Sequence, residues 1–141
     1  MKFDRLQVAP PTICSFVHRC PLAILALLVL MGCTDVVTTR FATLAEAKSK
    51  GALQRGWLPP LLPSSTRLIV ERNNLDLNLG TGSFDYDAAE RAAYLDELSR
   101  AGAIARIEQD CDVLTIITNS SRWEIRLPRS SGKALWSMQP L

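Results

Sequence analysis

Cys33 is the residue whose surroundings most clearly indicate a chemical modification. It follows Gly32 at the end of an unbroken apolar run of eleven residues, Pro21–Met31. As a helix, such a run would span about 16 Å, roughly half of the ~30 Å hydrocarbon core of a bilayer. Three basic residues precede it: Lys2, Arg5 and Arg19. This arrangement is typical of a secretory signal, and we predict that residues 1–32 form a cleaved signal peptide.

The junction itself, Leu30-Met31-Gly32-Cys33, resembles a bacterial lipobox. The resemblance implies that Leu30, Met31 and Gly32 are read by the signal peptidase and that Cys33 becomes the lipidated N-terminus. It also implies three acyl chains, and two or more chains suffice for stable membrane anchoring. Thr34, rather than an aspartate, follows the cysteine. In a Gram-negative envelope this favours the outer membrane, with the domain facing the periplasm.

Histidine and cysteine are scarce beyond this junction. The single histidine, His18, lies in the predicted leader, and Cys111 is the one cysteine after Cys33. An imidazole-activated nucleophile, a histidine metal site and an intramolecular disulfide are therefore excluded. We expect no metal, no cofactor and no enzymatic activity. Acidic and basic residues balance over residues 33–141, which argues against a nucleic-acid partner.

An enzyme that uses carboxylates alone is the alternative. Asp85/Asp87 and Asp110/Asp112 are acid pairs two residues apart, so on a strand both carboxylates of a pair would point the same way. Two carboxyl groups about 5 to 9 Å apart in an acidic pocket would fit glycoside hydrolysis.

Two capping boxes predict two helices. Thr43 and Glu46 open the first, which runs to about Lys50, and Asp87 and Glu90 open the second, over 88–101. Strands are predicted where apolar and polar residues alternate or where β-branched residues gather: 66–71, 83–86, 112–118, 122–127 and 133–138, with 103–108 as a further candidate. Residues 75–79 also alternate, and Gly80-Thr81-Gly82 suggests a turn.

These elements predict one small α+β domain, residues 41–141, preceded by a lipidated tether at 33–40. It would contain about two helices and an antiparallel sheet of four to five short strands.

The first half of this domain resembles the YbbD head-domain family of uncharacterised bacterial lipoproteins. The residues that carry the resemblance are Phe41, Glu46-Ala47, Gly56-Trp57-Leu58-Pro59, Leu62-Pro63, Asn73–Asn78 and Phe84. They span about 41–87. The resemblance implies an envelope lipoprotein with Trp57 and Phe84 as core anchors, and it implies no particular activity.

We therefore expect a membrane-anchored, non-enzymatic binding or adaptor module. Its partners would be the membrane, through the lipid on Cys33, and another envelope protein or a cell-wall component. Trp57, Trp123 and Trp136 are the candidate contact residues if they are exposed and core residues if they are buried. An assembly accessory without a discrete ligand is a third interpretation.

Overall fold

A computed structural model describes residues 36–141. The predicted signal peptide, the recognition residues Leu30, Met31 and Gly32, and Cys33 lie outside these residues. Within 36–141, neither helix has the length and apolar character needed to cross a bilayer.

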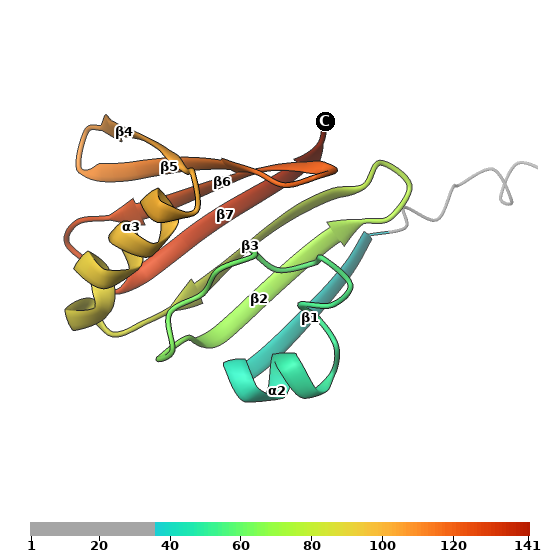
Figure 1. Cartoon of the computed structure of the whole chain (residues 1–141). Helices are drawn as coiled ribbons and strands as arrows, with labels where there is room; N and C mark the ends of the chain where they lie inside the picture. Colours follow the sequence, from blue (N-terminus) through green and yellow to red (C-terminus); the bar gives the residue numbers. More distant parts are fainter. Residues whose placement is uncertain (1–35) are drawn as a thin grey trace, which may run out of the picture. The chain divides into compact units, whose positions relative to one another are not determined.

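In the described part of the chain, seven antiparallel strands form one sheet, in the order β1-β2-β3-β7-β6-β5-β4 (Figure 1). The strands are β1 (Val36–Thr43), β2 (Arg67–Asn74), β3 (Leu79–Asp85), β4 (Ile104–Glu108), β5 (Cys111–Ile117), β6 (Ser121–Pro128) and β7 (Lys133–Pro140). Within residues 36–141, two α-helices accompany the strands: α2 (Leu44–Ser49) and α3 (Arg91–Arg100). The 3₁₀ turn η1 (Ala88–Glu90) leads into α3. The two-helix α+β prediction is correct, but the predicted number of strands is too low.

Strand β1 is the main omission, and it overturns part of the predicted tether. Residues 36–40 pair with β2 instead of forming a linker, with Val36 opposite Asn74 and Phe41 opposite Ile69. Phe41 is the only buried residue of β1, so the strand lacks the apolar alternation that identifies a strand in sequence. Residues 36–40 therefore belong to the sheet of the domain and not to a tether.

The glycines at 80 and 82 were predicted to form a turn, and this is wrong. Both lie inside β3, and the turn before it is made by residues 75–78, where the Asn74 side chain accepts a hydrogen bond from the Leu77 amide (3.0 Å). A Cβ atom on Gly82 would lie 2.1 Å from the Val70 carbonyl oxygen and 2.5 Å from the Trp136 ring. Glycine is needed there because the indole lies directly against the backbone of β3.

The two capping boxes have different outcomes. Thr43 caps α2 as predicted, accepting a hydrogen bond from the Glu46 amide (3.2 Å), while the Glu46 carboxylate accepts one from the Ala42 amide (2.8 Å). Asp87 stands at the N-cap position of η1, but its side chain makes no capping hydrogen bond; its carboxylate pairs with Arg67 at 2.8 Å. The chain therefore enters α3 through the 3₁₀ turn η1.

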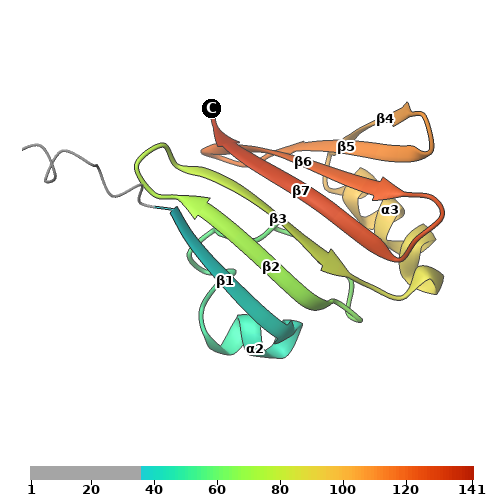
Figure 2. The same cartoon turned by 180° about the vertical axis from the view of Figure 1, so that it is seen from behind.

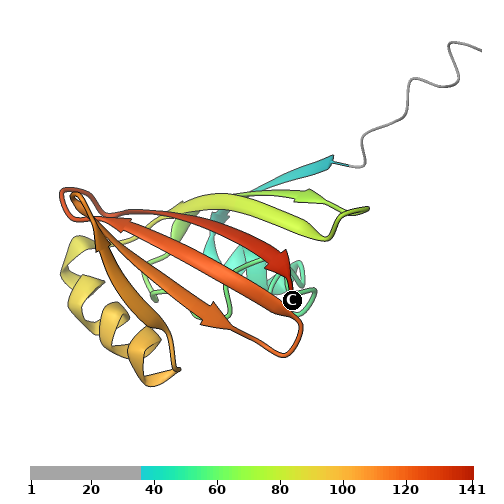
Figure 3. The same cartoon turned by 90° about the horizontal axis from the view of Figure 1, so that it is seen from above.

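Both helices and the segment 50–66 lie on one side of the sheet, which buries the core there (Figures 2 and 3). The opposite face has no covering layer within residues 36–141, and charged and hydroxyl side chains occupy much of it. On that face Arg106, Glu108, Glu124 and Arg126 form a network of ion pairs at 2.7–3.0 Å. These pairs are partly exposed, so each contributes little to stability.

One end of the sheet brings distant parts of the chain together. Four segments lie at this end: the start of β1, the β2–β3 turn (75–78), the β5–β6 turn (118–120) and the C-terminal residue Leu141 (Figure 1). We call it the hairpin end.

Candidate functional site

A cleft of about 400 Å³ lies at the hairpin end, between the segment after α2 and the sheet. Its volume falls in the range of small-ligand sites. Its lining comes from four separate parts of the chain: Leu53, Arg55, Gly56, Leu58 and Pro60; Asn78; Thr118, Ser120, Ser121 and Trp123; and Met138. The cleft therefore exists only in the folded protein.

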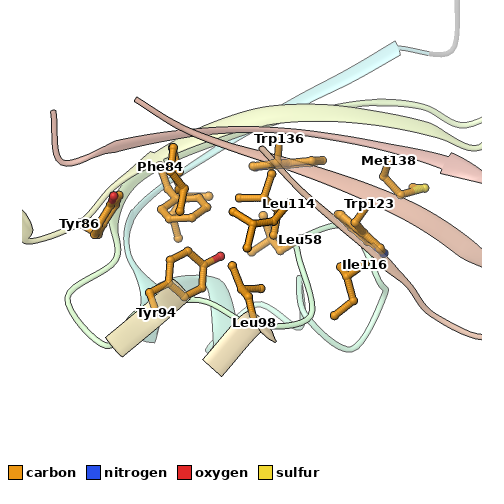
Figure 4. Close-up of a cluster of buried hydrophobic side chains, with 14 of the residues drawn as sticks. Leu58, Phe84, Tyr86, Tyr94, Leu98, Leu114, Ile116, Trp123, Trp136 and Met138 are labelled. Carbon is orange, nitrogen blue, oxygen red and sulfur yellow. The ribbon is translucent and has the colours of Figure 1, made fainter. Parts of the chain in front are cut away.

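The inner wall of the cleft is apolar. Leu58, Trp123 and Met138 belong to the buried core and still line the cleft. Trp123 packs against Trp136, with ring centroids 5.6 Å apart at an interplanar angle of 48°. Figure 4 shows these side chains together on the helix side of the sheet. A wall of this kind favours an apolar group of a ligand.

The rim of the cleft is polar and is held by local hydrogen bonds. In the β5–β6 turn the Thr118 amide donates to the Ser121 carbonyl at 2.9 Å, and the Leu141 amide donates to the Ser120 carbonyl at 3.2 Å. Arg55 is the one ionisable side chain of the lining. Its guanidinium lies 4.3 Å from the centre of the Trp57 ring and donates to the Lys50 carbonyl at 2.7 Å.

Behind the cleft, the sheet contains a buried polar cluster that sequence reasoning missed. Glu71 and Asn73 point to the core from β2 and are 0% and 3% exposed. Five polar atoms are buried here and lack a protein hydrogen-bond partner among residues 36–141. They are both carboxylate oxygens of Glu71, both polar atoms of the Asn73 amide and the indole nitrogen of Trp136. Each buried unsatisfied group costs about 1–3 kcal/mol. The available signal was that Glu71 and Asn73 share the face of Ile69 in a strand of period two.

Burial raises the pKa of Glu71, and the nearby Thr39 hydroxyl and the positive charge of Arg55 only partly oppose this. The folded state thus favours the protonated acid. The carboxyl group stabilises the fold below its ordinary pKa, and this stability is lost as the pH rises through the raised pKa of the folded state.

We therefore expect Glu71→Gln to unfold at a higher temperature than the natural protein at pH 8, because glutamine needs no proton to stay neutral. The difference in Tm should shrink towards pH 4. Thermal unfolding between pH 4 and pH 8 measures this. A Tm difference that stays constant with pH would show that folding does not raise the pKa of Glu71.

In each predicted acid pair, one carboxylate is held by arginine: Asp87 in the first pair and Asp112 in the second. Asp87 binds Arg67, and Asp112 lies between Arg91 and Arg129, at 2.5 and 2.7 Å. The hydrogen bond from Arg129 and the one from Arg91 lower the pKa of Asp112. A general acid needs a raised pKa, so this environment is the opposite of what that role requires.

The three tryptophans have different positions. Trp123 and Trp136 are each 3% exposed, so of the two predicted alternatives both are core residues. Their strands alternate inward and outward, and both rings fall on the covered face. Trp57 is half-buried beneath Arg55. Cys111 is half-buried too, and its thiol lies 3.7 Å from the Asp112 carbonyl oxygen.

Comparison with known proteins gives one match. No curated protein and no solved structure matches the chain. Residues 35–85 match the family model of the YbbD head domain. The match covers β1, α2, the segment that carries Arg55 and Leu58, and the β2–β3 hairpin. Over these residues, the chain resembles the YbbD head-domain family.

Proposed function

We propose that this protein is an envelope lipoprotein, anchored through lipid on Cys33, whose domain is a non-enzymatic binding module. The cleft at the hairpin end is its binding site. Its ligand is a segment of another envelope protein that presents an apolar side chain next to an acidic group. The lipid anchor confines the domain near one membrane, which raises its effective concentration towards partners there.

The observation that carries this proposal is the chemistry of the cleft lining. The wall of Leu58, Trp123 and Met138 suits an apolar group, and the hydroxyls and amide of the rim suit a peptide backbone. Arg55 is the single charge, and it is a cation. A guanidinium can bind a carboxylate through two parallel hydrogen bonds, so an acidic residue is the matching group on the partner.

A carboxylate-only enzyme is the second candidate, and Glu71 is the observation in its favour. A buried carboxyl group with a raised pKa is the usual form of a general acid. However, Glu71 is 0% exposed and is absent from the cleft lining. A substrate would have to displace the covering segment to reach it, so binding is the better supported function.

The residue after Cys33 bears on which membrane holds the protein. With Thr34 after the cysteine, we propose the outer membrane of a Gram-negative envelope, with the domain in the periplasm. Fractionation of cells into inner and outer membranes measures this directly.

Crosslinking in cells, followed by purification and mass spectrometry, tests the binding function. Four proteins are compared: the natural chain, Cys33→Ser, Ser120→Tyr at the exposed rim of the cleft, and Ser130→Tyr at the exposed β6–β7 turn as the matched control. We expect one envelope protein to be recovered with the natural chain and with Ser130→Tyr. Its recovery should fall at least tenfold with Ser120→Tyr and should be lost with Cys33→Ser.

Recovery that is equal for Ser120→Tyr and Ser130→Tyr would exclude the cleft as the binding site. No partner above background with the natural chain would contradict the adaptor function and favour the enzyme. A protein that still resides in the membrane after Cys33→Ser would contradict anchoring through this cysteine.

A further inference from the structure

We propose that the hairpin end of the sheet is a membrane-docking surface, whose exposed leucines enter the interfacial region of the bilayer that holds the lipid anchor. This inference rests on the proposed lipidation of Cys33 and goes beyond it, because it assigns an orientation of the domain and a second contact with the membrane.

The first argument is the length of chain between the anchor and the fold. Only Thr34 and Asp35 separate Cys33 from Val36, the first residue of β1. A fully extended chain covers at most about 3.6 Å per residue. The start of β1 is therefore held within about 11 Å of the Cys33 backbone, and a lipidated Cys33 lies at the membrane surface. Because residues 36–40 of the predicted tether belong to β1, only two residues remain between the lipidated cysteine and the sheet, and the domain cannot move far from the membrane.

The second argument is what surrounds Val36. In the strand register, Val36 lies opposite Asn74, next to the β2–β3 turn. Further across the sheet, Gly80 lies opposite Met138, and Ser121 lies opposite Pro140. The turns at 75–78 and 118–120 and the C-terminus therefore lie at the end where β1 begins, as Figures 1 and 2 show.

The third argument is the apolar surface at this end. Within residues 36–141, six of the ten exposed large apolar side chains belong to it, with exposures of 39–66%: Val37, Leu75, Leu77, Leu79, Ile117 and Leu141. The leucines of the β2–β3 hairpin are conspicuous because a solvent-exposed turn normally carries polar residues. Exposed apolar groups gathered at one place usually mark a contact surface.

Charge supports the same occupant. Arg72 and Arg122 are exposed beside the two turns and have no ion pair among residues 36–141, while Asp76 is the one acid of the β2–β3 turn. Cations beside inserted apolar residues favour an anionic lipid surface. Three acyl chains already supply enough affinity for the membrane. The role of the hairpin leucines is therefore to fix the orientation of the domain on the membrane. Asn78, Thr118 and Ser120 belong both to the docked turns and to the cleft lining, so the docked cleft opens at the lipid headgroups and its partner binds there.

The experiment uses the lipidated full-length product, purified from cells and reconstituted in vesicles of phosphatidylethanolamine and phosphatidylglycerol. Cys111→Ser removes the remaining free thiol. A polarity-sensitive fluorophore is then attached at Leu77→Cys in the hairpin, or at Ser130→Cys in the β6–β7 turn as the control; both positions are exposed. We expect the label at 77 to show blue-shifted emission, a several-fold rise in intensity and quenching by a lipid-borne quencher. The label at 130 should stay aqueous.

A second variant separates docking by the leucines from mere closeness to the anchor. With the fluorophore at Ser120→Cys, the combined change Leu75→Asp and Leu77→Asp should return the emission to its aqueous value, since two carboxylates replace the inserted side chains. These positions are exposed, so the fold tolerates the change.

The two proposals fail in distinguishable ways. Mass spectrometry that finds no acyl groups on Cys33 overturns the anchor and the docking together. A lipidated, vesicle-bound protein whose label at 77 is as aqueous as the label at 130 overturns the docking alone. Docking is also overturned if the two aspartates leave the emission from position 120 unchanged.

Discussion

Gly82→Ala is expected to lower the free energy of unfolding by about 3 kcal/mol or more. The added methyl group would meet the Val70 carbonyl oxygen at 2.1 Å and the Trp136 ring at 2.5 Å. The first contact is with the backbone of the paired strand β2, so a side-chain rotation cannot relieve it. Either β2 and β3 move apart, which breaks their ladder, or the indole leaves the core. Chemical denaturation followed by tryptophan fluorescence measures the loss.

Thr81→Ala is the matched control for this change. Thr81 directly precedes Gly82 in β3 and is exposed, so its replacement should cost less than about 1 kcal/mol through reduced strand propensity. Equal unfolding midpoints for the two variants would show that Trp136 does not lie against the β3 backbone.

Arg91→Met is expected to cost about 3 kcal/mol. The guanidinium of Arg91 joins α3 to the sheet: it donates to the Leu127 and Pro128 carbonyls at 3.0 and 3.1 Å and pairs with Asp112 at 2.5 Å. Its side chain is only 18% exposed and that of Asp112 17%. Methionine would fill similar space but leave the carboxylate and both carbonyls without this donor.

The free energy of unfolding lost in Arg91→Met should depend on pH. Because the pKa of Asp112 is lowered in the folded protein, this ion pair stabilises the fold above the ordinary carboxyl pKa, and the contribution is lost as the pH falls through the lowered value. The gap between Arg91→Met and the natural protein should therefore be largest near pH 7 and should narrow in acid.

Arg100→Met is the control on the same helix. Arg100 pairs with Asp96 at 2.8 Å in a fully exposed position, where an ion pair contributes a few tenths of a kcal/mol. If Arg91→Met and Arg100→Met unfold alike, Arg91 is a surface residue.

Local signals in the sequence were enough for much of the fold. The Thr43–Glu46 capping box acts over four residues, so α2 could be placed correctly. The alternation of Trp123, Ile125 and Leu127 gave β6 its length and its buried face. The residues that resemble the YbbD head domain likewise lie in one continuous stretch, and the family match at 35–85 agrees with them.

Features that depend on a partner residue far away in the chain could not be predicted from the sequence. Strand β1 is polar along much of its length and exists because β2 offers it an edge. Gly82 is found in a strand because Trp136, more than fifty residues later, needs the space above it. Glu71 has the residue type of a surface position, yet the register of β2 turns it into the core.

By itself, then, the sequence determined the α+β class, the position of α2 and the presence of a second helix near 88–101, because caps and apolar periodicity act between near neighbours. The tertiary structure decided which tryptophans are buried, which four segments form the cleft and which apolar residues gather at the hairpin end. Those facts depend on strand order, and strand order is set by contacts between residues far apart in the chain, whose pairing no local pattern records.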